Sequence, residues 1–494
     1  MGRDIESSGY TNEQRQRYRE KVRASLDVFE QMLAARSFDF DEPLIGMEIE
    51  LNLVDADYRP RMDNAEMLAA IADPEYQTEL GRFNIEFNVP PSRLAGGSVD
   101  ALEQGLRASL NEAERRCAEL GTHIIMVGIL PTVMPEDYEG EWMSSNARYQ
   151  MLNDAFLSAR GEDIHLDITG PTGERLFRYA DSLAPESACT SMQLHLQVKP
   201  QEFAAHWNAA QVLAGPQLAL GANSPYFLGK ELWAETRIEL FTQAADTRPV
   251  ELRNQGVRPR VFFGDHWITS IFDLFEENTL YFPALLPDLD DEDPQAAFDA
   301  GRTPKLAEMR LHNGTIYRWN RPIYDIVDGR PHLRVENRVL PAGPTVVDTL
   351  ANAAFYYGAL HSLTAEDRPV WTRMSFQTAA DNFEAGARNG IDAVLFWPGR
   401  RDVPASELVL RHLLPMVQDG LAAWEVDTAI SDRLLGILEG RCLTGQNGAH
   451  WQVDVVRRFE ERGMSRRDAL REMVRAYAVN MHSNEPVHTW ELPA

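Results

Sequence analysis

Four short segments carry ionisable or amide side chains at every second residue, with mostly apolar residues between them. They are Glu48-Ile49-Glu50, Glu86-Phe87-Asn88, Gln193-Leu194-His195-Leu196-Gln197 and Glu336-Asn337-Arg338. In a strand, alternate side chains point to opposite faces. If the four strands share a sheet, one face carries carboxylates, an imidazole and a guanidinium. Carboxylates that lie close together repel unless cations sit between them. The pattern therefore predicts a metal-dependent enzyme, and one that handles phosphate.

Glu48 and Glu50 form the strongest pair, because they lie within an otherwise apolar stretch. Burying two like charges on one face costs free energy unless they are paired or bind a metal. The alternative is an exposed strand face, which is common in antiparallel sheets. Glu86 has a similar apolar setting, and Glu79, seven residues earlier, is placed either to reach the same cavity or to lie on the surface.

His195 lies between Gln193 and Gln197, and these polar neighbours favour a cavity position over that of a satisfied core histidine. A neutral imidazole nitrogen there is a possible metal ligand. Glu336 and Arg338 share one strand face, which fits either an internal salt bridge or a metal ligand beside a phosphate clamp.

Further polar groups lie near these strands in the sequence. Arg318 and Arg321 precede the Glu336 strand, and Arg237 follows the loop that contains Asn223. Either arginine group is a candidate for binding a carboxylate substrate or a phosphate. The alternative for each is an ordinary surface ion pair.

Composition narrows the function classes. The net charge of −27 argues against binding nucleic acid or an anionic membrane, since both require a basic surface. All but four of the 48 basic residues are arginine, and no G-x-x-x-x-G-K-[ST] loop exists. Phosphate would therefore be held by arginines, backbone amides or metal ions. The three cysteines have no disulfide or zinc spacing.

No apolar targeting segment begins the chain, and no run of 18 apolar residues predicts a membrane span. The cytoplasm is therefore the expected location. The 494 residues predict two or three lobes or one elaborated catalytic domain. The oligomeric state is not readable from the sequence.

Periodicity predicts helices over residues 11–36, 65–71, 98–120, 200–220 and 345–360, and mainly helices from about residue 366 onward. Strands are expected over 44–54, 81–89, 122–130, 191–198 and 333–340, with a hairpin over 164–179. Alternating polar and apolar positions favour an α+β fold with a mainly antiparallel, curved sheet. One sheet face would line a cavity and helices would cover the other.

In the order and spacing of these motifs, the chain resembles the glutamate–cysteine ligase and carboxylate–amine ligase superfamily, whose catalytic fold is like that of glutamine synthetase. The matching segments are Gly46-Met47-Glu48-Ile49-Glu50, Glu79 with Glu86, the His195 strand, Ala222-Asn223-Ser224-Pro225, and Glu336-x-Arg338 before a helix. The resemblance spans about Leu44 to Leu360 and implies a catalytic domain over 41–365. A helical N-terminal segment over 1–40 and a helical C-terminal lobe over 366–494 are expected outside it.

The resemblance also implies site roles. By motif match, two or three magnesium ions would hold ATP on the ligands Glu48, Glu50, Glu79, Glu86, His195 and Glu336. Arg338 would contact the γ-phosphate, and Arg237 would contact a substrate carboxylate or phosphate. The other expected ATP or substrate contacts are Asn223, Gln193, Arg318 and Arg321. The expected catalytic residues are Glu48, Glu336 and Arg338.

The leading hypothesis is an ATP- and Mg-dependent ligase that joins glutamate to an amine, with cysteine as the first choice. The reaction would pass through an acyl phosphate. A different acid and amine pair, a guanidino-kinase-like phosphotransferase, a metal-dependent hydrolase and a non-catalytic nucleotide or metabolite sensor are the alternatives. The expected partners are small molecules, namely amino acids and ATP.

Overall fold

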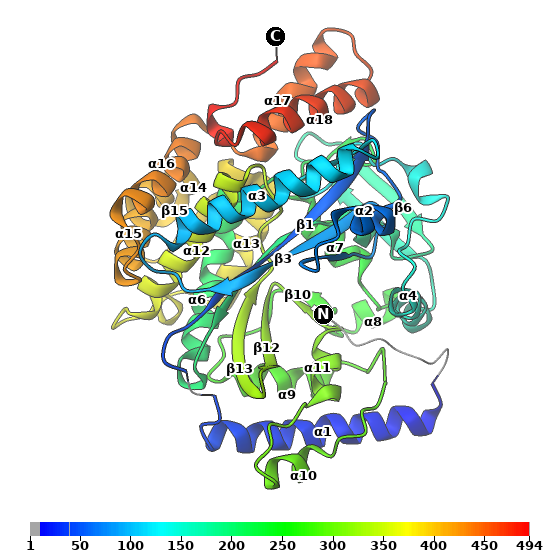
Figure 1. Ribbon diagram of the computed structural model, residues 1–494, viewed down its shortest axis with the longest axis vertical. Helices are drawn as coiled ribbons and strands as arrows, with labels where there is room; N and C mark the ends of the chain where they lie inside the picture. Colours follow the sequence, from blue (N-terminus) through cyan, green and yellow to red (C-terminus); the bar gives the residue numbers. More distant parts are fainter. Residues whose placement is uncertain (1–9, 39, 494) are drawn as a thin grey trace.

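The computed structural model describes residues 10–38 and 40–493 of the chain (Figure 1). Within these residues, seven strands form one antiparallel sheet in the order β12-β13-β7-β1-β3-β2, with β4 paired to one end of β1. The strands are β1 (Ile45–Asp55), β2 (Tyr76–Thr78), β3 (Asn84–Ser92), β4 (Thr122–Ile125), β7 (Met192–Gln197), β12 (Asn320–Val327) and β13 (Arg330–Asn337). The predicted α+β class with a mainly antiparallel sheet is confirmed.

The register brings the polar positions of the four sequence segments side by side on one face. Directly opposed pairs are Glu50 with Glu86, Glu48 with Asn88 and with Gln193, and Glu336 with His195. The intervening apolar residues point to the other face and are fully or almost fully buried, as for Ile49, Leu194 and Val335. A period of two along each strand therefore separates a polar sheet face from an apolar one.

Helices cover the apolar face. The helices α6 (Pro200–Gly221) and α12 (Val346–Thr364) are buried on nearly all sides, which is typical of helices inside a large protein. The hydroxyl of Tyr357 on α12 donates to the backbone of the sheet, at the carbonyls of Gly46 and His195. A third helix, α3 (Ser98–Ala118), crosses this region on the outside in Figure 1.

Glycines set the spacing between these helices and the next layer. A Cβ on Gly386 of α13 (Phe376–Asn389) would lie 2.4 Å from the carbonyl oxygen of Gly215 in α6. A Cβ on Gly420 of α15 (Leu414–Ala423) would lie 1.9 Å from the carbonyl oxygen of Gly358 in α12. No larger side chain fits without separating the helices, so these two contacts fix the C-terminal helices against the core.

The N-terminal helix α1 (Asn12–Ala34) lies at the opposite end of the molecule (Figure 1). Thr11 and Gln14 form a reciprocal capping box at its start. Its apolar face packs on α9 (Ile271–Tyr281), α10 (Pro294–Asp299) and α11 (Ala307–Asn313). The buried hydroxyl of Tyr18 donates to the carbonyl of Glu308 at 2.9 Å.

The remaining elements surround this core. The other helices are α2 (Asn64–Ile71), α4 (Ala147–Arg160), α5 (Ala184–Ser187), α7 (Thr236–Ala244), α8 (Val250–Asn254), α14 (Ala405–Leu408), α16 (Thr428–Thr444), α17 (Gly448–Glu461) and α18 (Arg466–Ser483). Four two-stranded sheets pair β5 (Ile164–Thr169) with β6 (Arg175–Ala180), β8 (Tyr226–Phe227) with β9 (Lys230–Glu231), β10 (Val261–Phe262) with β11 (Tyr317–Arg318), and β14 (Val394–Trp397) with β15 (Arg401–Pro404). Across the described residues, no helix is both long and apolar enough to cross a membrane.

Three predicted strands differ from the observed ones by three residues or more. The strand expected over 81–89 begins and ends three residues later, as β3. The strand expected over 122–130 ends at Ile125, because the next carbonyls bind side chains instead of a neighbouring strand. Tyr477 donates to the carbonyl of Met126, and Asn52 and Thr190 donate to that of Val127. The strand expected over 333–340 begins and ends three residues earlier, as β13.

Candidate active site

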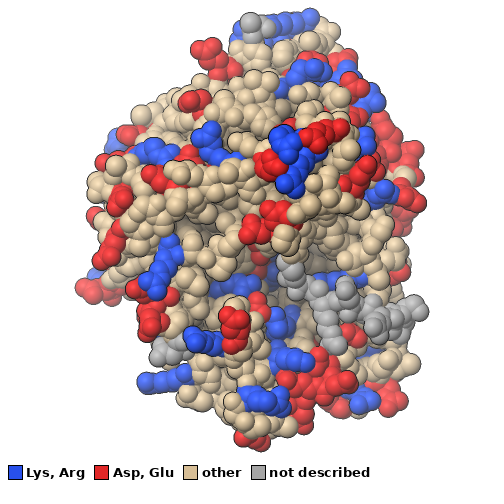
Figure 2. Space-filling view, viewed as in Figure 1, with Lys and Arg blue, Asp and Glu red and all other residues tan. Residues whose placement is uncertain are grey.

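The polar face of the sheet forms one wall of a cavity of about 820 Å³. This volume falls in the range of small-molecule sites. The cavity lining continues along α11, β11 and β12, the last of which is the edge strand of the same sheet, and α4 also contributes residues. Figure 2 shows this side of the molecule hollowed at its centre, with basic side chains gathered on the lower wall.

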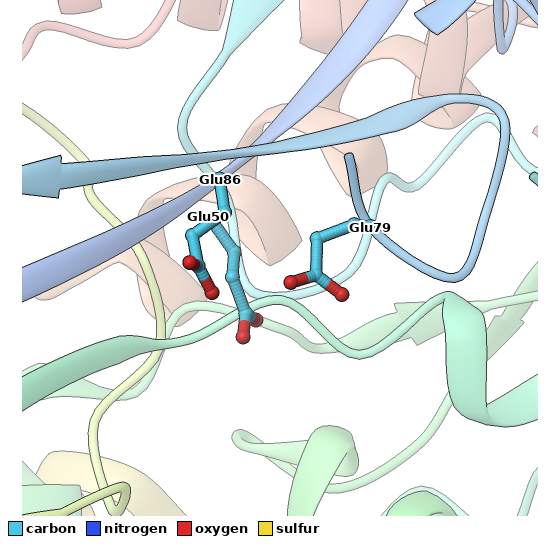
Figure 3. Close-up of side chains that lie close together, drawn as sticks. All are labelled: Glu50, Glu79 and Glu86. Atoms are coloured by element: carbon cyan, nitrogen blue, oxygen red, sulfur yellow. The ribbon is translucent and has the colours of Figure 1, made fainter. Parts of the chain in front are cut away.

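Three carboxylates converge at the sheet wall (Figure 3). Glu50 comes from β1, Glu86 from β3, and Glu79 from the segment between β2 and β3. One carboxylate oxygen of each lies within 4.8 Å of the others. Among the described residues, this is the one group of acidic, histidine or cysteine side chains close enough to share a metal ion.

Burial disfavours the charged form of all three carboxylates, and like charges add to this at Glu79 and Glu86. Burial, followed by the charges of Glu86 and Glu50, raises the pKa of Glu79 well above its usual value. Burial and the charges of Glu48 and Glu50 raise the pKa of Glu86 to about 7. Burial also raises the pKa of Glu50, although Arg338 and the Ser191 amide oppose it. Three oxygen donors that repel one another suit a hard divalent cation such as Mg²⁺.

Glu48 lies beside this group in a different setting. Its Oε1 is 3.1 Å from Nε2 of His195, and Nε of Arg334 donates to Nδ1 of the same ring at 3.1 Å. Burial alone would raise the pKa of Glu48, but His195 and Arg338 lower it below the usual value. The Arg334 donor makes Nδ1 the acceptor, so a neutral His195 ring carries its proton on Nε2, facing Glu48.

Glu336 is held by two arginines. Nη1 of Arg338 donates to Oε1 of Glu336 at 2.6 Å, and Nη2 of Arg321 lies 3.0 Å from both carboxylate oxygens. Burial opposes ionisation, but these two cations hold the pKa of Glu336 well below its usual range. Arg338 also donates to Oε1 of Gln193 at 2.6 Å, which fixes its guanidinium at the cavity wall.

The six expected metal ligands therefore fall into two sets. Glu50, Glu79 and Glu86 have the charge and spacing for a cation. Glu48, His195 and Glu336 are already compensated, and an ion bound to Nε2 of His195 would require Arg334 to leave Nδ1. A metal role for this second set stays a prediction, and His195 itself lies behind the residues that line the cavity.

Two expected ligand contacts lie outside the cavity lining. Asn223 is fully buried, and its amide contacts the carbonyl of Ala342 and side chains of the C-terminal helices. Arg318 is 1% exposed, and its guanidinium pairs with Glu277 at 2.7 Å. Both side chains are engaged with protein groups in this structure, and a ligand role for either stays a prediction.

The other expected contacts, Arg237, Arg321, Gln193 and Arg338, line the cavity. However, most of the N–H donors of Arg237 contact other protein groups. Its Nε pairs with Glu235 at 2.9 Å, its Nη1 donates to the carbonyl of Arg338 at 3.3 Å, and its Nη2 donates to that of Val339.

Sequence reasoning missed several charged groups at the cavity, among them Arg148, Glu186 and Arg334. Arg148 lines it at the first turn of α4, and its guanidinium has no ion pair among the described side chains. Glu186 lines it from the short helix α5, where burial and the charge of Glu50 raise its pKa to about 8. Arg334 lies on β13 two residues before Glu336, so the same alternation that singled out Glu336 and Arg338 also marked it. No pattern marked Arg148 or Glu186.

A comparison with models of protein families identifies the family of this chain. The model of glutamate-cysteine ligase family 2 matches residues 44–476, which is most of the chain and includes every cavity residue named above. The chain belongs to glutamate-cysteine ligase family 2. Membership in this family makes it a carbon–nitrogen ligase of the carboxylate–amine type. No curated protein sequence matches it.

Solved structures share the fold of this family member at low sequence identity. One is glutamate–cysteine ligase from Francisella tularensis in complex with AMP, with a TM-score of 0.56 and 13% identity, covering 92% of this chain and 91% of that one. Another is a bifunctional glutathione synthetase from Pasteurella multocida, with a TM-score of 0.50 and 12% identity. The match to the Pasteurella protein covers 93% of this chain and 55% of that one.

Proposed function

We propose that the protein is an ATP- and Mg²⁺-dependent ligase that forms a γ-glutamyl amide, with glutamate and cysteine as the leading substrates. The observation that carries the proposal is the meeting of three converging carboxylates with the Arg338–Glu336 pair in one cavity. An anionic nucleotide requires both cations and arginines. The AMP bound to the related Francisella enzyme supports an adenine nucleotide here.

The reaction requires two nucleophilic substitutions, one after the other. An oxygen of the substrate side-chain carboxylate attacks the γ-phosphorus of ATP, the bond to the β-phosphate oxygen breaks, and ADP leaves. The amine of the second substrate then attacks the acyl carbon, inorganic phosphate leaves, and the nitrogen loses a proton. Phosphorylation is required because a free carboxylate has no leaving group that an amine displaces. Exclusion of water from the cavity during the reaction would protect the acyl phosphate.

The cavity residues divide these tasks. Glu50, Glu79 and Glu86 would hold Mg²⁺, which neutralises triphosphate charge. Arg338 would stabilise the negative charge on the transferred phosphoryl group, and Glu336 keeps that guanidinium in place.

Arg148 is the best candidate for binding the acid substrate. Its side chain lines the cavity and has no carboxylate partner among the described residues, whereas Arg321, Arg334 and Arg338 are each paired or hydrogen-bonded. A substrate carboxylate would provide the missing counter-charge. The cavity residues constrain the choice of amine acceptor less, and cysteine is proposed on the basis of the family resemblance.

A product-resolved assay tests the proposal. The protein is incubated with Mg-ATP, glutamate and a mixture of amino acids, and ADP and products are followed by mass spectrometry. A γ-glutamyl product formed together with ADP and phosphate is the expected result. The matched control is Glu50→Gln, which keeps the side-chain shape and removes one charge of the metal group.

The same assay separates the alternatives. ADP together with a phosphorylated small molecule and no amide would replace the ligase with a phosphotransferase. Hydrolysis of an added substrate without ATP would indicate a hydrolase. Binding of Mg-ATP without turnover in the presence of any amino acid would indicate a sensor. Any of these three results overturns the proposed reaction.

A further inference from the structure

The C-terminal helices reach the cavity through a chain of buried side chains. Gln452 on α17 donates through Nε2 to Oδ1 of Asn223 at 2.8 Å, and also to its carbonyl at 3.2 Å. Nδ2 of Asn223 donates to the hydroxyl of Tyr477 on α18 at 2.8 Å. That hydroxyl in turn donates to the carbonyl of Met126 at 2.7 Å. Gln452, Asn223 and Tyr477 are each at most 1% exposed.

The backbone of α17 also packs closely at this junction. A Cβ on Gly448, the first residue of α17, would lie 2.1 Å from Oδ1 of Asn223. The amide of Ala449 donates to the carbonyl of Ala222 at 2.9 Å. The start of α17 therefore touches the 222–223 backbone directly, and a shift of the helix moves Asn223 with it.

Asn223 is connected to the cavity by an ion pair. Its backbone amide donates to Oε2 of Glu235 at 2.7 Å, and Oε1 of Glu235 pairs with Nε of Arg237. Glu235 is 0% exposed and Arg237 is 3% exposed, so water does not substitute for either partner. We call Gln452, Tyr477, Asn223, Glu235 and Arg237 the buried relay.

The relay ends on the turn that follows β13. Arg237 donates to the carbonyls of Arg338 and Val339, and Asn223 donates to that of Ala342. Two relay members thus fix three carbonyls of residues 338–342. The Arg338 side chain projects from the start of this turn to Glu336 and Gln193 in the cavity.

We propose that the buried relay makes the C-terminal helices α17 and α18 a positioning device for Arg338. In this proposal Arg237 and Asn223 hold the backbone that carries the reactive arginine, and neither is a ligand contact. Loss of a relay hydrogen bond lets the 338–342 turn move and reduces the contact of Arg338 with the transferred phosphoryl group. The effect on turnover rests on the proposed ligase function, whereas the effect on the turn does not.

Two conservative variants break the relay at its far end. Tyr477→Phe removes the shared hydroxyl, and Gln452→Met removes both donors to Asn223 while keeping a similar volume. Tyr356→Phe is the matched control. Tyr356 is also fully buried, on α12, and its hydroxyl makes no hydrogen bond among the described residues. Gln452→Met serves if Tyr477→Phe does not fold.

Hydrogen–deuterium exchange of the full chain reports on the mobility of the 338–342 turn and requires no enzyme activity. We expect both relay variants to increase exchange in peptides that cover residues 338–343, and the control to leave it unchanged. Unchanged exchange in these peptides in both relay variants would overturn the proposal. This readout is decisive even if the protein turns out to catalyse another reaction.

Steady-state kinetics then test the coupling to Arg338. In the wild-type background, Tyr477→Phe is expected to lower kcat roughly tenfold with little change in the KM for ATP, since supporting residues have effects of about this size. In an Arg338→Lys background the same change is expected to cost less than about twofold, because the relay has lost the group it positions. Equal losses in the two backgrounds would show a purely structural role and would overturn the proposal.

Discussion

Replacing Glu86 with glutamine should stabilise the protein when divalent cations are absent. Glu86 lies directly opposite Glu50 on the neighbouring strand, and burial with the charges of Glu48 and Glu50 raises its pKa to about 7. A glutamine removes the repelled charge and keeps an oxygen that accepts from Nδ2 of Asn88, which donates to Oε1 of Glu86 at 2.7 Å. Like charges directly opposed across a strand pair are destabilising.

The size of the gain follows from the pKa. The folded-state pKa lies above the usual value of 4.5, so the stability that Glu86 contributes is fully present below about pH 4.5 and is lost as the pH rises through about 7. At 1.36 kcal/mol per unit, the loss is about 3 kcal/mol above pH 8. For a chain of 494 residues this corresponds to a rise in Tm of about 3 °C in the variant.

Thermal unfolding in EDTA at about pH 5 and about pH 8 measures this difference. Glu30→Gln is the control, because Glu30 is exposed on α1. The variant should gain Tm at the higher pH and gain much less at the lower one. Added Mg²⁺ should raise the Tm of the wild type more than that of Glu86→Gln. Equal gains at both pH values, or equal Mg²⁺ shifts in the two proteins, would refute the reasoning.

Three further changes probe other parts of the cavity. Glu336→Gln should abolish ligase activity and lower Tm by about 2 to 4 °C in a thermal scan, because it leaves the half-buried guanidinia of Arg321 and Arg338 without their shared anion. An unchanged Tm would contradict this. Arg338→Lys should lower kcat about a hundredfold in the ADP-release assay, since an ammonium does not reproduce the planar contacts of a guanidinium, and normal ATP turnover would show that Arg338 serves structure alone. Arg148→Gln should raise the KM for the acid substrate about tenfold and leave that for ATP unchanged, through loss of a charged hydrogen bond; a selective rise in the KM for ATP would assign Arg148 to the nucleotide instead.

Alternation along single strands made much of the polar sheet face predictable. Glu48, Glu50, Glu86, Gln193 and Glu336 were each identified from their own strand, and the structure places all of them on one cavity wall. The period of two is a local property of the chain, so it is readable before the strand order is known.

The remaining site depended on contacts between distant segments. The strand β12 was missed because Pro322 interrupts its strand signal, and the structure places it at the edge of the sheet, where a proline is tolerated. Asn223 was assigned to a ligand contact because it lies in the Ala222-Asn223-Ser224-Pro225 segment that carries the family resemblance. Its partner Tyr477 lies 254 residues later in the chain, and nothing local reveals that contact.

The buried relay has a consequence for biosynthesis. Tyr477 lies 254 residues after its partner Asn223, and Gln452 lies 229 residues after it. Closing so long a loop delays these contacts until α17 and α18 have been synthesised. If the relay acts as proposed, nascent chains that lack α17 and α18 have no firmly seated Arg338. Seating of this arginine would thereby follow the synthesis of these two helices.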